Sequence, residues 1–142
     1  MSEESTVVQK MVSASLCRRL IEAGATKGAE LGKAFTIAIV DASGVLKALE
    51  RMDGAPLVSV QVAQDKAYTA VGFGISTAAW HDFIKDDPPL AAGATAGIDR
   101  LVIFGGGFPI TVDGGLVGGI GVSGGHYSED SQVAEAALRA VG

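Results

Sequence analysis

Short glycine-containing turns join the consecutive apolar runs of this chain and limit how its strands can pair. Residues 35–51 and 109–123 each read as two strands around such a turn, Asp41-Ala42-Ser43-Gly44 in the first and Asp113-Gly114-Gly115 in the second. Turns of this composition favour β-hairpins. Because the two strands of a hairpin are antiparallel, these turns exclude a doubly wound parallel sheet.

The spacing of apolar residues, together with capping residues, predicts four helices around the hairpins. They are expected from Thr6 to about Leu31, after Pro56, from Ser76 and from Ser128. The third helix should end at Asp87-Pro88-Pro89, because the residue before a proline avoids the α region. An irregular stretch should then continue to about Ile98.

The fold class that follows from these elements is α+β. The chain has 142 residues, of which 48% are hydrophobic, so residues 1–142 are assigned to a single domain. Leu101–Phe104 is expected to add a strand to the hairpins. The prediction is therefore an antiparallel sheet of about five strands flanked by helices, in the order α-β-β-α-α-β-β-β-α.

Charge and hydropathy exclude several classes of partner. The chain has 11 basic and 16 acidic residues and a net charge of −5, which disfavours binding to nucleic acid. No apolar run reaches the ~18 residues of a membrane span, and the N-terminus is acidic and polar, unlike a signal peptide. We therefore expect a cytoplasmic protein without a membrane partner. The single cysteine, Cys17, is expected to be a buried thiol.

The glycine-rich run at residues 119–125 matches two catalytic motifs by letter, and only the second has part of the context it needs, a strand before it and a helix after it. Its G-x-G-x-x-G would need a βαβ unit and an acidic residue about 20 positions later to bind a dinucleotide, and the chain ends first. Its G-x-S-x-G, centred on Ser123, would need an acid and a histidine from later strands. Gly119 and Gly121 instead leave one strand face bare, which predicts that a helix or a ligand packs closely on it.

Lys66, His126 and Asp130 are the predicted catalytic residues. His126 and Asp130 are four positions apart across the start of the last helix, so they could pair as an oriented imidazole or act as two metal ligands, although two groups alone do not make a metal site. Lys66 lies among small residues of the second helix, from which its ammonium could reach a carboxylate such as Asp53 or an anionic ligand. In an acid/base hypothesis, His126 is the base, Asp130 orients it and Lys66 holds a substrate carboxylate.

A small pocket is expected where Lys66, the Gly105-Gly106-Gly107 run and the His126 turn converge. Three successive glycine amides can form a nest that holds an anion. No Cys-x-x-Cys or His-x-x-x-His spacing occurs, so no metal site is predicted. The predicted ligand-binding residues are Arg51, Asp53, Lys66, Gly105, Gly106, Gly107, Ser123, His126 and Tyr127.

Five segments, in order, resemble the small GlcG/HbpS-like domain family, which is often labelled haem-degrading and is also found as the C-terminal domain of PduO-type proteins. The segments are residues 40–44, 51–55, 63–69, 106–110 and 118–130. The resemblance implies an antiparallel sheet flanked by helices and homo-oligomers up to octamers. For some members it also implies binding of haem, a corrinoid or iron.

One departure from the family pattern concerns the iron ligand. Haem-binding relatives can use a histidine of the first helix as axial ligand, whereas residues 1–32 of this chain contain no histidine. A tetrapyrrole in this chain would therefore need His126, His81, Tyr127, Cys17 or no protein ligand at all.

Three functions are consistent with these observations. The first is an oligomeric cytoplasmic protein that binds a tetrapyrrole, such as haem or a corrinoid, or another carboxylated organic molecule. The second is a small cofactor-independent acid/base enzyme of a catabolic pathway, a lyase, isomerase or hydratase that uses His126. The third is a structural accessory oligomer without catalysis.

Overall fold

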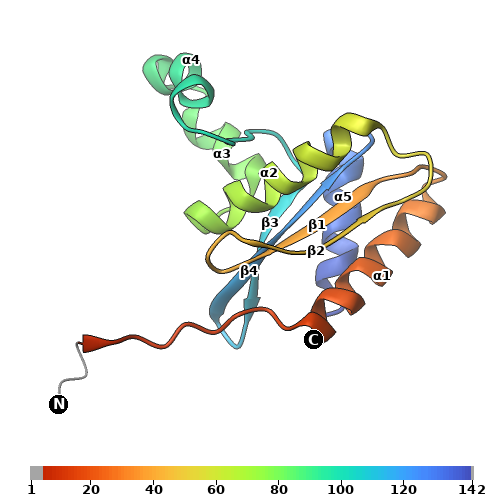
Figure 1. Cartoon of the computed structure of the whole chain (residues 1–142). Helices are drawn as coiled ribbons and strands as arrows, with labels where there is room; N and C mark the ends of the chain where they lie inside the picture. Colours follow the sequence, from red (N-terminus) through yellow and green to blue (C-terminus); the bar gives the residue numbers. More distant parts are fainter. Residues whose placement is uncertain (1–4, 142) are drawn as a thin grey trace.

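Two hairpins from different parts of the chain form one four-stranded antiparallel sheet (Figure 1). The computed structural model describes residues 5–141, so the outermost residues assigned to the predicted domain, 1–4 and 142, lie outside it. The order across the sheet is β2-β1-β4-β3. The strands are β1 (Thr36–Asp41), β2 (Leu46–Arg51), β3 (Gly107–Val112) and β4 (Gly115–Ser123).

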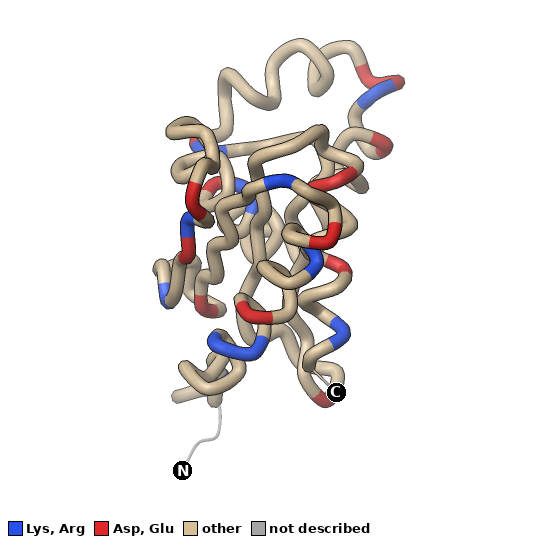
Figure 2. Tube along the Cα trace, turned by 90° about the vertical axis from the view of Figure 1, so that its right-hand side faces the viewer, with Lys and Arg blue, Asp and Glu red and all other residues tan. Residues whose placement is uncertain are grey.

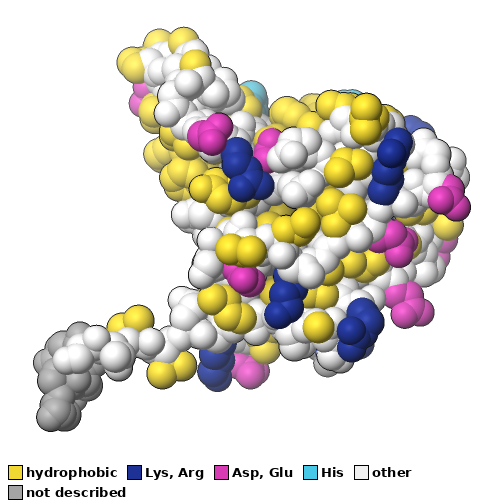
Figure 3. Space-filling model, viewed as in Figure 1, with side chains coloured by type: hydrophobic (Ala, Val, Ile, Leu, Met, Phe, Trp, Pro, Cys, Tyr) yellow, Lys and Arg dark blue, Asp and Glu magenta, His cyan; other side chains and the backbone are white. Residues whose placement is uncertain are grey.

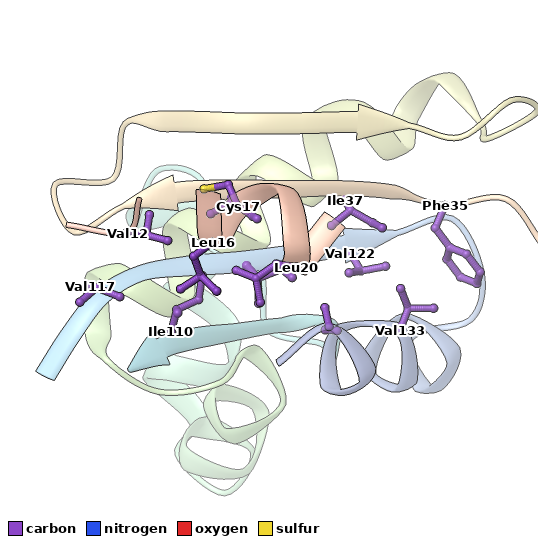
Figure 4. Close-up of a cluster of buried hydrophobic side chains, with 14 residues drawn as sticks. Val12, Leu16, Cys17, Leu20, Phe35, Ile37, Ile110, Val117, Val122 and Val133 are labelled. Atoms are coloured by element: carbon purple, nitrogen blue, oxygen red, sulfur yellow. The ribbon is translucent and has the colours of Figure 1, made fainter. Parts of the chain in front are cut away.

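The described residues also form five helices. They are α1 (Ala14–Glu30), α2 (Leu57–Phe73), α3 (Thr77–Ile84), α4 (Pro88–Gly97) and α5 (Tyr127–Leu138). Helices α1 and α5 cover one face of the sheet, where Leu20 and Val133 pack against Ile37 and Val122 (Figure 4). Helix α2 covers the other face, and α3 and α4 extend outwards from its end (Figure 1).

The bare face of β4 lies directly beneath α2, which confirms the predicted close packing on Gly119 and Gly121. A Cβ atom on Gly119 would lie 2.5 Å from the carbonyl oxygen of Ala67. A Cβ atom on Gly121 would overlap the carbonyl oxygen of Ala63 and lie 2.6 Å from the backbone nitrogen of Ala67. The helix backbone therefore occupies the space that side chains on this strand would need.

The prediction of about five strands is wrong by one strand, because Leu101–Phe104 does not join the sheet. The amide of Val102 donates instead to the side-chain oxygen of Thr69 on α2, at 3.0 Å. This side-chain bond satisfies a group that a strand would pair with a neighbouring backbone. The observed order is α-β-β-α-α-α-β-β-α.

The stretch expected to be irregular contains helix α4. Asp87 caps this helix by accepting a hydrogen bond from the amide of Leu90, and Pro88 lies in its first turn. A proline is tolerated there because the first amides of a helix have no partner within it. The Pro-Pro pair therefore follows the end of α3 and also begins α4.

The first helix starts at Ala14, not at Thr6, and Ser13 is its N-cap. The preceding residues are extended: the amide of Val12 donates to the carbonyl of Val117 on β4. Val12 is buried in the main core, so it fits the apolar spacing expected of a helix although its backbone is extended. The predicted capping of α3 by Ser76 is confirmed by its bond from the amide of Ala79.

Positive and negative residues are mixed along the chain in the view of Figure 2. No helix within residues 5–141 has the length and apolar character that crossing a membrane would require.

Candidate ligand-binding site

A buried ion pair joins α2 to α5 beneath the end of β4. The side chain of Lys66 is fully buried, and its Nζ lies 2.8 Å from Oδ2 of Asp130 and 2.9 Å from the carbonyl oxygen of Val122. The other carboxylate oxygen of Asp130 accepts a hydrogen bond from the amide of Gly125, at 3.0 Å. The ammonium predicted to reach a carboxylate does so, but its partner is Asp130 and not Asp53.

Burial changes the proton affinity of both members of this pair. Removal from water lowers the pKa of Lys66 below its ordinary value, and the nearby carboxylate of Asp130 only partly opposes this. Removal from water likewise raises the pKa of Asp130, against the opposing effect of Lys66. Loss of hydration is the larger effect on the pKa of each group. Burying the two charges therefore opposes part of the stabilisation that their attraction provides.

The predicted glycine nest packs around this pair. A Cβ atom on Gly106, whose φ is 125°, would lie 2.7 Å from Nζ of Lys66. A Cβ atom on Gly107 would lie 2.6 Å from the backbone oxygen of Lys66. The amide of Gly107 donates to the hydroxyl of Thr77 on α3, at 3.0 Å, so it is already bonded within the protein. These two glycines allow the chain to pass close to Lys66.

His126 is the N-cap of α5, one turn before Asp130. Its Nδ1 accepts a hydrogen bond from the amide of Ser128 at 3.2 Å, and the carboxylate of Glu129 accepts one from the amide of His126 at 2.9 Å. Both carboxylate oxygens of Asp130 are bonded elsewhere, to Lys66 and to Gly125. The structure therefore does not form the His126–Asp130 pair of the acid/base hypothesis, and the catalytic roles of these residues stay predictions.

A cleft opens on the outer side of the buried pair, between α3, the segment before β3 and the start of α5. Its volume is about 410 Å³, and it is lined by Ala78, His81, Asp82, Ile103, Phe104, Gly105 and Tyr127. The rings of Phe104 and Tyr127 are 45% and 51% exposed, and their centroids lie 6.4 Å apart. Two aromatic rings therefore form one wall of a cleft that remains open to solvent.

The buried pair supports this aromatic wall from behind. Nζ of Lys66 lies 5.1 Å from the centroid of the Phe104 ring, within the range of a cation–π contact. On the other side, the ring of His126 lies against that of Tyr127, with centroids 4.1 Å apart. Both residues beside the wall were predicted from sequence, but they hold the aromatic rings and do not themselves line the cleft.

The predicted ligand-binding residues lie in several separate places. Gly105 and Tyr127 line the cleft. Asp53 lines a separate shallow groove of about 550 Å³ between α1 and the end of β2. Arg51 donates to the carbonyl of Ala55 at 2.7 Å and 3.0 Å, which closes its own loop. Ser123 is the partly buried last residue of β4. The ligand-binding roles of these residues remain predictions.

Sequence reasoning missed Phe104, because an apolar residue beside glycines carries no chemical signal of its own. A usable signal existed for the opposite wall. Ala78, His81 and Asp82 are spaced at i, i+3 and i+4 in a predicted helix, and such residues share one helix face.

The comparison with known families matches most of the chain. A family described as "Haem degrading protein HbpS-like" matches residues 12–139. The chain belongs to the HbpS-like family. The resemblance found in the sequence is thereby confirmed.

Several relatives of this HbpS-like chain are bacterial proteins. It is 31% identical, over 89% of each chain, to an uncharacterized 15.0 kDa protein from the dhaT-dhaS intergenic region of Citrobacter freundii. It is 33% identical to the corrinoid adenosyltransferase PduO of Salmonella typhimurium, over 87% of this chain. It spans only 37% of PduO, so the activity of that whole protein does not transfer with the match.

Solved structures of the family have the same fold. A PduOC:heme complex is 32% identical, with a TM-score of 0.86 over 92% of this chain and 95% of that one. HbpS is 26% identical, with a TM-score of 0.88 over 100% of this chain and 98% of that one. One of these similar structures therefore holds a haem.

Proposed function

We propose that this HbpS-like chain is a small-ligand-binding protein whose ligand is a tetrapyrrole, held in the cleft beside Phe104 and Tyr127. The observation that carries the proposal is the pair of half-exposed aromatic rings on one wall of a cleft of about 410 Å³. Ligand pockets of this size are typically lined by apolar and aromatic side chains. The similarity to a PduOC:heme complex supports the same class of ligand.

The residues of the cleft suit a flat ring that carries carboxylates at its edge. Phe104 and Tyr127 offer apolar ring faces, and the small side chain of Ala78 leaves room for the ligand on the opposite helix face. The carboxylates would lie towards solvent, because Lys66 is already bonded to Asp130 and is fully buried. Lys66 therefore supports the binding wall and is not available to hold the ligand's carboxylate.

Hemin should bind the wild-type protein and change its absorption spectrum in a saturable way. In Tyr127→Ala, binding should weaken roughly 2- to 13-fold, because an aromatic contact contributes about 0.5–1.5 kcal/mol. Tyr68→Ala is the matched control, since Tyr68 is an exposed tyrosine on α2 that does not line the cleft. A titration followed by absorbance, with a corrinoid tested in parallel, measures both variants.

The proposal for haem is refuted if micromolar hemin leaves the spectrum of the wild-type protein unchanged. The placement in the cleft is refuted if Tyr68→Ala and Tyr127→Ala weaken binding equally.

We also propose that the protein is a cytoplasmic homo-oligomer. Apolar side chains gather over the outer side of α2 in Figure 3. Leu57 and Val58 are 77% and 68% exposed at its start, and Phe73 is 49% exposed at its end. An exposed apolar surface of this kind is typical of protein interfaces. A second copy of the chain would cover it.

Light scattering should give a mass that is a multiple of 14.3 kDa. Val58→Glu, which places a charge within the apolar surface at the start of α2, should shift the distribution towards smaller species. Lys10→Glu, at an exposed position outside α2, should not. A wild-type mass of one chain at micromolar concentration would refute the oligomer.

A further inference from the structure

We infer that His81 is the axial ligand of a haem iron bound in the cleft between α3 and residues 103–105. The inference rests on the proposed function and adds the residue that would bind the metal. A porphyrin supplies four equatorial nitrogens to its iron, so a single protein side chain is enough to complete an axial bond. The histidines, Cys17 and Tyr127 are the side chains to be compared.

His81 is the imidazole that faces the cleft. It lies on α3, lines the cleft together with Ala78 and Asp82, and stands across from the wall formed by Phe104 and Tyr127. Its ring forms no hydrogen bond or ion pair with another side chain or backbone group in residues 5–141, and it is exposed. A nitrogen lone pair is therefore available on the side where the ligand would lie.

The other histidine, His126, already uses its Nδ1 to cap helix α5. Nδ1 of His126 accepts the amide hydrogen of Ser128, so in the neutral ring the proton is on Nε2. Nε2 then has no lone pair to offer an iron. Binding through Nδ1 would require His126 to give up the cap of α5, and binding through Nε2 would require its proton to move to Nδ1, which also removes the cap.

Cys17 is excluded by its position. Its side chain is buried in the main core with 1% of its surface exposed, on the sheet face that α1 and α5 cover. The cleft lies beside α3, which is attached to the end of α2 on the opposite face (Figure 1). A sulfur–iron bond would therefore require the core to open.

Two hydrogen bonds at the start of α3 fix the position of the helix that carries His81. Its N-cap Ser76 accepts a hydrogen bond from Ala79, and Thr77 accepts one from Gly107 at the start of β3. Trp80, next to His81 in sequence, is buried between Phe73 and Phe83. The bond between Thr77 and Gly107 links α3 directly to the start of β3, and so fixes the helix that carries His81 to the chain that follows Phe104.

The test compares hemin with iron-free protoporphyrin IX, because only hemin can form the bond to His81. In His81→Gly, hemin binding should weaken about tenfold or more, the loss typical of weakened metal sites, while protoporphyrin IX should bind as in the wild type. Added imidazole should restore the wild-type hemin spectrum to His81→Gly by occupying the vacated space. Unchanged protoporphyrin binding also shows that the variant is folded.

Two further variants separate His81 from the other candidates. His126→Asn keeps a side chain that can cap α5, and Tyr127→Phe keeps the aromatic ring while removing its oxygen. Both should keep the band positions of the wild-type hemin complex, which report the iron ligand, although their affinity should fall because each alters the aromatic wall. A shift of these bands in either of them, together with a wild-type spectrum in His81→Gly, would overturn the assignment and leave the proposed function standing. Failure of the wild-type protein to bind either porphyrin would overturn both.

Discussion

Gly121→Val is expected to lower the free energy of unfolding by about 1–3 kcal/mol, and by more if α2 cannot move away from the sheet. The added Cβ would overlap the carbonyl oxygen of Ala63 and lie 2.6 Å from the nitrogen of Ala67. Both are backbone atoms of α2, so no rotation of a side chain can relieve the contact. Urea denaturation followed by circular dichroism measures the loss.

Gly72→Ala is the matched control for this substitution. Gly72 lies on α2, the helix that packs on Gly121, but a Cβ atom on Gly72 meets nothing within 4 Å. Alanine is the better helix former by up to about 1 kcal/mol, so this variant should be as stable as the wild type or more stable. If Gly121→Val and Gly72→Ala unfold at the same urea concentration, α2 does not rest on the bare strand as the structure shows.

The packing of α2 on β4 was predictable because it depends on a local pattern. Two glycines at alternate positions of a strand must leave one face bare, whatever covers it. The Pro-Pro pair after Asp87 was less informative, because proline is common both just after the end of a helix and in the first turn of a helix. In the structure, the bond from the amide of Leu90 to the side chain of Asp87 marks the start of a helix there.

The candidate site was harder to predict because its key contacts are distant in sequence. Lys66 and Asp130 are 64 positions apart, and no local pattern relates them. The four-residue spacing of His126 and Asp130 was misleading for a different reason. His126 is an N-cap with φ −67° and ψ 149°, outside the helical region, so the usual neighbourhood of residues i and i+4 does not apply to it.

Removing either charge of the buried pair is expected to destabilise the protein strongly. Lys66→Met and Asp130→Asn should each lower the free energy of unfolding by about 3–5 kcal/mol, because each leaves the other group buried without its partner. The double variant should lose clearly less than the sum of the single losses. Denaturation of all four proteins gives the coupling energy of the pair.

Lys33→Met and Glu129→Gln are the matched controls on the surface. Their ion pair is as short, at 2.8 Å, but its side chains are 48% and 24% exposed. Exposed pairs contribute about 0–1 kcal/mol, so these substitutions should have small effects. Equal losses in the two sets would mean that burial does not set the strength of the Lys66–Asp130 contact.

The pH dependence of stability should follow from the directions of the two pKa changes. Because burial raises the pKa of Asp130, the folded state holds more protons than the unfolded state above the ordinary pKa of an aspartate, and stability falls as pH rises through that interval. Because burial lowers the pKa of Lys66, the unfolded state holds more protons below the ordinary pKa of a lysine, and stability rises with pH there.

The pair should therefore contribute least to stability between these two intervals, where both groups are charged. Relative to the wild type, the double variant should be most stable in this middle range and lose that advantage towards both acid and alkaline pH. Unfolding free energies of the two proteins across the pH range give the difference directly. A difference that is independent of pH would show that neither proton affinity is altered by burial. A difference with the opposite curvature would show that attraction within the pair outweighs the loss of hydration.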